Sequence, residues 1–126
     1  MKTRLFLFLL ITFQMSVSCN SDKDSDTPSI VGNWTLYKVE NVGKIDELCD
    51  KDCATEVYKS DGTCIFSEDI YVFTYIYKVD GKFVKLYNLE TGLLERTEEI
   101  VSLTKDEMRK IIYDNHSEVL VFKRDK

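Results

Sequence analysis

The sequence predicts an all-β fold, a small eight-stranded antiparallel up-and-down β-barrel. From Ile30 onward, apolar and polar residues alternate with a period of two, which is the pattern of strands that bury one face. Asp-Gly pairs and similar turn residues separate the alternating segments, so consecutive strands are expected to pair as hairpins. Eight strands in such a meander are enough to close into a barrel, and closure removes exposed sheet edges.

Each strand is expected from its own alternating segment, in chain order. The segments are residues 33–40, 54–59, 63–67, 70–79, 82–88, 93–103, 108–113 and 118–124. The Asp-Gly pair at 61–62 predicts a type I′ turn, since this pair accepts positive φ angles, and the pair at 80–81 predicts another hairpin. Thr104 and Glu107 match a capping box, which predicts one helical turn between the strands on either side.

The chain divides into three parts. Residues 1–18 are expected to be a lipoprotein signal peptide, because an apolar run at 5–13 follows positive charges and is far shorter than the roughly 20 residues of a spanning helix. Residues 19–29 are expected to be a lipidated cysteine and a flexible acidic tether, since they offer almost nothing to bury. Residues 30–126 form the barrel domain.

The charge balance of the chain is acidic. Its 17 Lys and Arg oppose 22 Asp and Glu, for a net charge of −5, and removal of Lys2 and Arg4 with the signal peptide would make this −7. An acidic domain does not attract the phosphate backbone, so the sequence predicts no nucleic-acid partner.

Cys19 follows the signal core directly and resembles the lipobox cysteine of bacterial lipoproteins. The resemblance implies lipid on both its thiol and its amine, and two or three acyl chains anchor a protein stably. The alternative is an ordinary secretory signal cut elsewhere, with Cys19 in a disulfide. Asp22, Lys23 and Asp24 resemble the surface-export signal of Bacteroidota lipoproteins, which implies the cell-surface leaflet of the outer membrane. The alternative there is a spacer on the periplasmic face.

Several motifs of the barrel domain resemble the lipocalin-like domains of Bacteroidota lipoproteins. "IVGNWTL" places Gly32 and Trp34 as in the lipocalin G-x-W motif, and "VLVFKR" resembles the closing strand. "YKSDGT" and an I-x-S-L-T-x-x-x-M step at 100–108 lie between them, whereas the T-D-Y loop motif of lipocalins proper is absent. The resemblance implies a lipocalin-like barrel in which Trp34 closes the floor and Arg124 stacks on it through a cation–π contact.

The strand at 70–79 carries a row of aromatic residues on one face. Tyr71, Phe73, Tyr75 and Tyr77, the aromatic row, alternate with residues that are also largely apolar. One interpretation is the wall of a ligand cavity, because such cavities are mostly apolar with a few polar groups. The other is a core face, with the opposite face meeting the chain's own segments or a partner.

Three cysteines remain in the barrel domain, Cys49, Cys53 and Cys64. An oxidising compartment favours one disulfide and leaves one thiol, and all three pairings stay open. A zinc site is not expected, because C-x₃-C with one more cysteine and the distant His116 is poor ligand spacing. We therefore predict no metal and no cofactor.

The sequence indicates binding and not catalysis. His116, the single histidine, falls in a predicted turn, and no Ser or Cys has the context of an activated nucleophile. The leading hypothesis is a monomeric, membrane-anchored barrel that binds a small apolar or amphipathic ligand. The alternative is a cell-surface interaction protein with a filled barrel that binds a protein or glycan.

Overall fold

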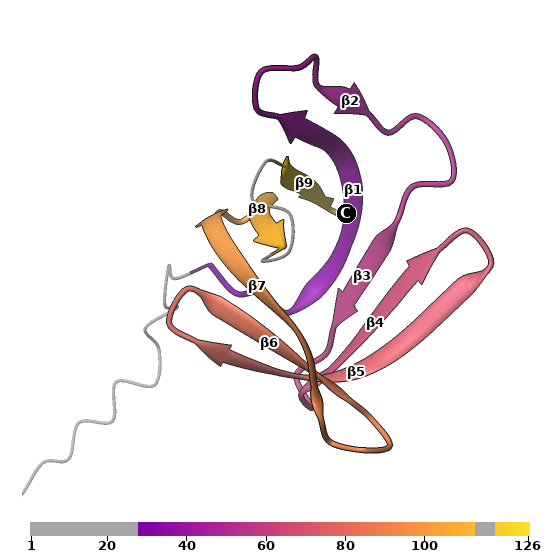
Figure 1. The fold of residues 1–126 in the computed structure, drawn as a ribbon, viewed down its shortest axis with the longest axis vertical. Helices are drawn as coiled ribbons and strands as arrows, with labels where there is room; N and C mark the ends of the chain where they lie inside the picture. Colours follow the sequence, from indigo (N-terminus) through magenta and orange to yellow (C-terminus); the bar gives the residue numbers. More distant parts are fainter. Residues whose placement is uncertain (1–27, 113–117) are drawn as a thin grey trace, which may run out of the picture.

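The computed structural model describes residues 28–112 and 118–126, which form nine β-strands and no helix (Figure 1). The strands are β1 (Gly32–Asn41), β2 (Glu47–Leu48), β3 (Thr55–Tyr58), β4 (Thr63–Glu68), β5 (Tyr71–Asp80), β6 (Phe83–Asn88), β7 (Leu94–Leu103), β8 (Glu107–Ile112) and β9 (Glu118–Arg124). All eight expected strands are present, and each agrees with its expected bounds to within one residue. The two-residue β2 was not expected, since its segment is polar and does not alternate.

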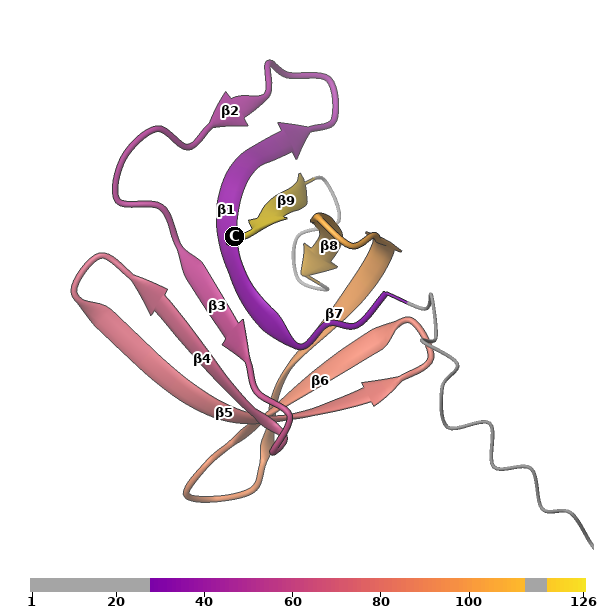
Figure 2. The ribbon, with the colours of Figure 1, turned by 180° about the vertical axis from the view of Figure 1, so that it is seen from behind.

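The strands form a single antiparallel sheet that closes on itself. Their order is β2-β1-β3-β4-β5-β6-β7-β8-β9, and β1 also pairs with β9. This pairing runs the length of β1, from Trp34 opposite Arg124 to Asn41 opposite Glu118. The eight strands other than β2 therefore make a closed antiparallel barrel, and the predicted fold class is confirmed. Figures 1 and 2 show β1 curving between β3 and β9.

β1 has different neighbours along its two halves. Residues 32–35 pair with β3, whereas the later part pairs with the short β2. A register shift between Leu36 and Lys38 bends the strand there, as β-bulges do. The loop after β2 fills the space that β3 leaves, because the amide of Leu36 donates to the carbonyl of Ala54 at 2.8 Å.

The core fills the inside of the barrel with side chains from six of the nine described strands. Its buried members are Trp34, Tyr58, Cys64, Val84, Leu86, Met108 and Phe122. Each belongs to the inward-facing set of its strand, as the period of two requires. Burial of a large apolar side chain contributes about 1.5–3 kcal/mol, so this cluster is the main source of stability.

The connections alternate between two ends of the barrel, since neighbouring strands are antiparallel. At the first, which we call the open end, lie the connections 42–54, 69–70 and 89–93. At the other, the closed end, lie the connections 59–62, 81–82 and 104–106 and the first and last described residues. The amide of Asp125 donates to the carbonyl of Asn33 at 2.9 Å, which joins the C-terminal segment to the start of β1 at the closed end.

Two local predictions about turns are wrong. The turn at 61–62 is not type I′, because Gly62 has a positive φ (+89°) and Asp61 does not. The Asp61 carboxylate instead accepts hydrogen bonds from the amide and the hydroxyl of Thr63, at 2.9 and 2.6 Å, which fixes a different turn. Thr104 does cap the amide of Glu107, at 3.0 Å, but Glu107 is the first residue of β8 and no helical turn forms.

Candidate ligand site at the open end

The aromatic row lies on the inner face of β5, and the barrel covers only half of it. Tyr75 pairs across the sheet with the buried Cys64. Tyr75 and Tyr77 pack against the core, whereas Tyr71 and Phe73 are 60% and 47% exposed. The rings of Tyr71, Phe73 and Tyr75 form a stack with centroids 6.4 and 6.5 Å apart. The predicted wall is therefore a core face at one end and an accessible ring surface at the other.

The exposure of Tyr71 and Phe73 follows from the unequal lengths of the neighbouring strands. β4 pairs with residues 71–76 of β5, but β6 pairs only with residues 75–80. The first part of β5 thus has a neighbour on one side only and extends with β4 toward the open end (Figure 1). Phe66 of β4 stacks on Phe73, with ring centroids 6.3 Å apart, and widens the aromatic surface.

Arg96 enters the same region from β7, which is separated from β5 by β6 alone. A register shift in β7 pairs Arg96 with Leu86 and Leu94 with Tyr87. Leu86 is buried in the core, so its partner Arg96 also faces inward. The guanidinium carbon lies 5.7 Å from the ring centre of Phe66 and 6.0 Å from that of Tyr75, which is the range of cation–π contacts.

Three charged residues are buried beneath this region and form what we call the buried charge cluster, Glu56, Glu98 and Lys110. The ammonium of Lys110 donates to Glu98 Oε2 at 2.7 Å and also to Glu56 Oε1. The hydroxyl of Tyr58 donates to Glu56 Oε2 at 3.0 Å. Because each buried charge faces an opposite one, the cost of desolvating them is offset.

The pKa directions within the cluster follow from this geometry. Burial raises the pKa of Glu56, although Lys110 opposes the shift. For Lys110, burial favours the neutral amine, but the two carboxylates outweigh burial and raise its pKa. Burial also raises the pKa of Tyr58 well above its usual value, so its hydroxyl remains a donor. Lys110 is therefore a fixed positive charge in the middle of the barrel.

Sequence reasoning did not find Arg96 or the buried charge cluster. A usable signal existed, because Lys110 stands between Met108 and Ile112 in the alternation of β8, where an inward apolar residue is expected. Charged residues at inward positions of three different strands indicate an internal ion-pair network.

The residues expected to close the barrel floor lie together at the closed end. The guanidinium carbon of Arg124 is 4.2 Å from the centre of the Trp34 ring, and Trp34 Nε1 donates to the carbonyl of Ile30 at 2.8 Å. Gly32 has a φ of +144°, and a Cβ there would meet Arg124 Nη1 at 2.3 Å. Arg124 can cross to Trp34 only because residue 32 has no side chain. Trp34 belongs to the same buried core against which Tyr75 and Tyr77 of the aromatic row pack.

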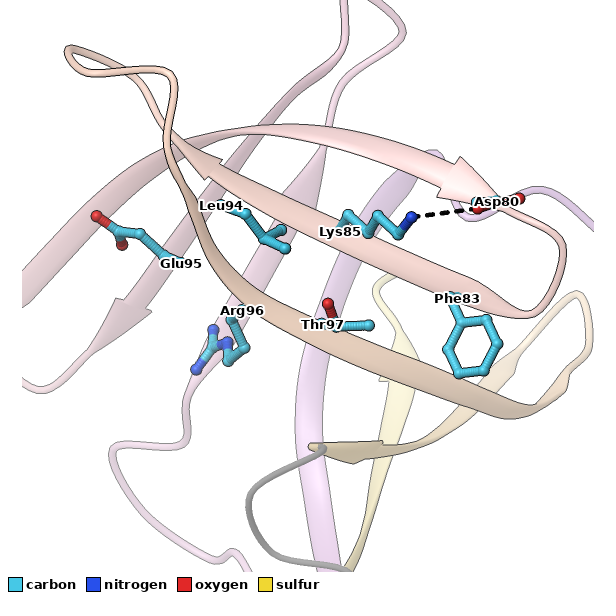
Figure 3. Close-up of a pocket in the computed structure, with 7 residues that line it drawn as sticks. All are labelled: Asp80, Phe83, Lys85, Leu94, Glu95, Arg96 and Thr97. Carbon is cyan, nitrogen blue, oxygen red and sulfur yellow. Dashed lines mark hydrogen bonds and ion pairs between the residues drawn. The ribbon is translucent and has the colours of Figure 1, made fainter.

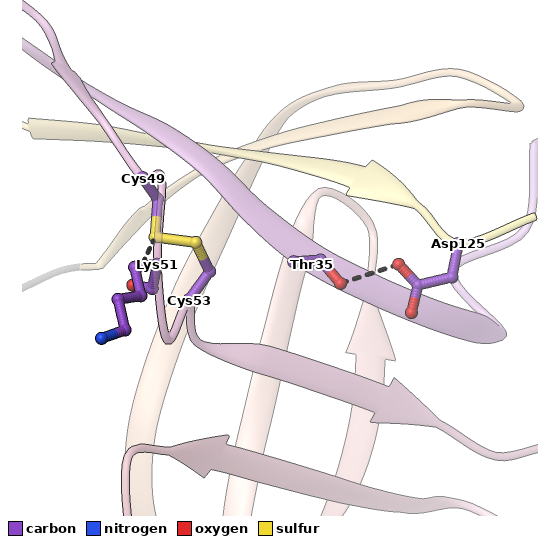
Figure 4. The surroundings of a disulfide bond; sticks show 5 residues. All are labelled: Thr35, Cys49, Lys51, Cys53 and Asp125. Carbon is purple, nitrogen blue, oxygen red and sulfur yellow. Dashed lines mark hydrogen bonds between the residues drawn. A yellow bond between two sulfur atoms is a disulfide. The ribbon is translucent and has the colours of Figure 1, made fainter.

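Of the three cysteines left open, the structure pairs Cys49 with Cys53, with the Cα atoms 5.8 Å apart (Figure 4). This disulfide closes a small loop between β2 and β3. Cys64 belongs to β4, is buried in the core and is not in a disulfide. Burial raises the pKa of its thiol to about 12. The odd thiol is thus a core residue.

Two grooves lie outside the aromatic row. One, of about 620 Å³, lies along β6 and β7 and is lined by Asp80, Phe83, Lys85, Leu94, Glu95, Arg96 and Thr97 (Figure 3). In Figure 3 the Arg96 side chain extends away from Lys85 and Thr97, which pair across the outer face. A smaller groove of about 140 Å³ adjoins the disulfide. No member of the aromatic row lines either groove.

Several expected site residues lie outside the described ranges. These are Cys19, Asp22, Lys23, Asp24 and His116. Within residues 28–112 and 118–126 no three His, Cys, Asp or Glu side chains are grouped as metal ligands. In the same ranges no helix has the length and apolarity to cross a membrane.

Two solved structures from Bacteroides share the fold. A lipocalin-like protein from Bacteroides uniformis matches with a TM-score of 0.58 and 12% identity, over 75% of this chain and 97% of that one. An uncharacterized protein from Bacteroides eggerthii matches with a TM-score of 0.60 and 16% identity, over 77% of this chain and 100% of that one. No family model matches the chain, and no curated protein does. At these identities the likeness supports a lipocalin-like fold and carries no function with it.

Proposed function

We propose that this protein is an outer-membrane lipoprotein, anchored through Cys19, whose lipocalin-like barrel binds a small amphipathic molecule at its open end. The observation that carries the proposal is the exposed half of the aromatic row. Tyr71 and Phe73 point to the inner side of the barrel and yet remain 60% and 47% exposed. Stacked rings that face inward and are not covered are the kind of surface that an apolar ligand would bury.

The rings are held in place before any ligand arrives. The stack continues from Phe73 into the half-buried Tyr75, and Tyr77 donates from its hydroxyl to the carbonyl of Lys59 at 2.7 Å. Tyr77 also packs edge-on against the buried Tyr58, with centroids 5.1 Å apart. A rigid surface loses little conformational entropy on binding, so its contact area converts efficiently into affinity.

The filled interior sets the depth that a ligand can reach. The core and the buried charge cluster fill the interior of the barrel, and Tyr75 and Tyr77 pack against that core. A ligand would therefore lie across the mouth, with one side on the rings and the other in solvent. This geometry favours an amphipathic molecule over a purely apolar one. We propose binding and not catalysis, because the charged groups inside the barrel are paired with one another.

The ring surface can be tested with N-phenylnaphthylamine, an uncharged aromatic probe that fluoresces in apolar surroundings. We expect the wild-type protein to bind it and the Tyr71→Ala/Phe73→Ala double variant to lose most of the signal. Val72→Ala is the matched control, because Val72 lies between the two on the same strand, is similarly exposed and faces outward. Native mass spectrometry of the purified wild-type protein then shows whether a cellular ligand stays bound. Equal fluorescence in all three proteins would contradict the proposed surface.

The anchor is tested separately through Cys19. We expect Cys19→Ser to move the protein from the membrane fraction to the soluble fraction of lysed cells and to abolish its labelling by palmitate. Protease treatment of intact cells then distinguishes the cell surface from the periplasmic face. An unlabelled wild-type protein would contradict the lipoprotein assignment and leave the ring surface unaffected.

A second candidate function is binding of a protein or glycan at the cell surface. Ten large apolar side chains of the described chain are exposed at the open end. They are Val42, Ile45, Leu48, Ile70, Tyr71, Val72, Phe73, Leu89, Leu93 and Leu94. Since five of the ten lie in connections between strands, they favour contact with a large partner. Under this function Ile70→Ser would weaken binding to intact partner cells or glycans, whereas N-phenylnaphthylamine would bind no better than to a control protein.

A further inference from the structure

Arg96 is the inward-facing cation nearest the aromatic row, and a local irregularity places it there. Because β7 shifts register between its pairs Leu86–Arg96 and Tyr87–Leu94, Glu95 is an extra residue. Bulges of this kind redirect side chains and are common beside functional sites. Here the shift allows Leu94 to face outward and Arg96 to face inward, two residues apart in an otherwise regular strand.

The Arg96 side chain uses one side of its guanidinium and leaves the other available. Its Nε atom is 3.1 Å from Glu98 Oε1, and its side chain is 26% exposed. Nε and Glu98 Oε1 are not aligned for a hydrogen bond, and neither has another partner among the described residues. The terminal nitrogens likewise have no hydrogen bond to any part of the chain that the structure describes. These two nitrogens form a planar fork that matches a carboxylate, sulfonate or phosphate.

The nearby carboxylates do not compete for this fork. Glu98 Oε2 accepts from Lys110, and Glu95 accepts from the side-chain amide of Asn88 at 2.6 Å. Counting charges, Glu56 and Glu98 are balanced by Lys110 and Arg96. Glu98 Oε1, which has no hydrogen bond within the described chain, lies 3.1 Å from Nε. An anion at the fork would therefore be added to a locally neutral set of buried groups. A cationic ligand would instead meet the terminal nitrogens of a guanidinium, which carry only donors and no acceptor.

We propose that the amphipathic ligand of the open end carries an anionic group, and that Arg96 binds this group through its terminal nitrogens while the ligand's apolar body lies on Phe73 and Tyr71. The inference rests on the proposed function and specifies its ligand class. The rings that Arg96 contacts, Phe66 and Tyr75, each stack on Phe73. A single small molecule can therefore touch the guanidinium and the exposed rings together.

The test compares two probes that share one aromatic body. Anilinonaphthalene sulfonate is N-phenylnaphthylamine with an added sulfonate, so the pair isolates the contribution of the negative charge. We expect the wild-type protein to bind the sulfonate at least about tenfold more tightly, the size of a charge-assisted hydrogen-bonded contact. Arg96→Gln should remove this preference, so that the two probes bind with equal affinity, and Arg96→Lys should retain part of it.

Controls separate this result from unfolding and from other cations. Thermal melts of both Arg96 variants show whether the barrel is intact. Lys85→Gln is the matched control, because Lys85 is a cation on the outer face of the adjacent strand and lines the 620 Å³ groove. Lys85→Gln should bind the sulfonate with the same preference as the wild-type protein. Loss of the preference in Lys85→Gln would place the anion in the outer groove and overturn the inference.

The outcomes distinguish the inference from the function beneath it. The wild-type protein could bind both probes with equal affinity while Tyr71→Ala/Phe73→Ala still abolishes binding. This result would overturn the role of Arg96 and would still support the ring surface as the binding site. Failure of the wild-type protein to bind either probe would overturn the proposed function and the inference with it. A sulfonate preference that survives in folded Arg96→Gln would overturn the inference alone.

Discussion

Lys110 shows that neighbouring residues determine the charge state of a buried side chain in this barrel. Lys110 is fully buried, yet it remains charged because Glu56 and Glu98 contact its ammonium. The cluster joins β3, β7 and β8, strands that do not all pair with one another. It therefore connects opposite walls of the barrel, and its removal should lower the stability of the whole domain.

We expect Lys110→Met to lower the free energy of unfolding by about 3–5 kcal/mol, because two buried carboxylates would lose their counter-charge. Denaturant titration measures this change. The exposed Lys78 provides the control, and Lys78→Met should stay within about 0.5 kcal/mol of wild type. Replacing Glu56, Glu98 and Lys110 together with apolar residues of similar size should recover most of the loss. A stable Lys110→Met protein would show that the cluster is not formed.

Cys64 is expected to be inert in the folded protein. Its thiol is buried and has a pKa of about 12, so almost no thiolate forms at neutral pH and reagents cannot reach it. Alkylation with iodoacetamide, followed by mass spectrometry of the peptide that contains Cys64, should show no modification in native protein. The same peptide should be fully modified in denaturant, and rapid modification of native protein would contradict its placement in the core.

At the scale of the element, strand length and register decide which side chains become accessible. β5 extends beyond β6, which exposes Tyr71 and Phe73, and the bulge in β7 brings Arg96 to the same region. Neither feature depends on the residue types at the site itself. The ligand surface that we propose is thus a consequence of how three neighbouring strands are staggered.

The pairing of β8 with β9 should depend on pH through Glu107. Lys123 donates to the Glu107 carboxylate at 2.6 Å, and this hydrogen bond lowers the pKa of Glu107 below its usual 4.5. Glu107 therefore binds a proton more readily in the unfolded chain than in the folded protein. The stabilisation by the Lys123–Glu107 pair is fully present above about pH 4.5 and is lost as the pH falls through the lowered pKa of Glu107. Denaturant titrations between about pH 6 and pH 3 measure the free energy of unfolding. This free energy should decrease less on acidification in Glu107→Gln than in wild type. The same slope in both proteins would contradict this contribution.

The sequence predicted the elements better than the site. Alternation located eight strands to within one residue, because a strand with one buried face is a local pattern. Type I′ geometry at 61–62 was wrong because the Asp61 side chain bonds to Thr63, a competing local interaction. The exposed part of the aromatic row and the position of Arg96 could not be predicted, since they depend on where β6 ends and where β7 shifts register.

For the whole molecule, the two ends of the barrel have different roles. The closed end carries Trp34, Arg124 and Gly32 in one interlocked contact, and the described chain begins beside it at Pro28. An anchor upstream of Pro28 would therefore leave the open end accessible. Exposed apolar side chains are concentrated at that open end, in keeping with a binding surface that faces away from the attachment point.

The barrel as a whole should depend on Trp34. This side chain is fully buried, and Arg124 covers it. We expect Trp34→Ala to cost about 3–5 kcal/mol through lost burial and the cavity left behind, enough to unfold a marginally stable domain. Thermal denaturation measures the effect, with the outward, 44% exposed Tyr37 as control, since Tyr37→Ala should melt close to wild type. A Trp34→Ala protein that melts within a few degrees of wild type would contradict the role of the closed end.

The sequence by itself determined the all-β class, the positions of the eight strands and the contact between Trp34 and Arg124. These follow from local alternation, from turn residues and from a resemblance carried by short motifs. Only the tertiary structure decided that Cys49 pairs with Cys53, that Glu56, Glu98 and Lys110 meet inside the barrel, and that Tyr71 and Phe73 stay exposed beside Arg96. The reason is physical, because burial and charge pairing depend on partners that closure of the barrel brings from distant strands.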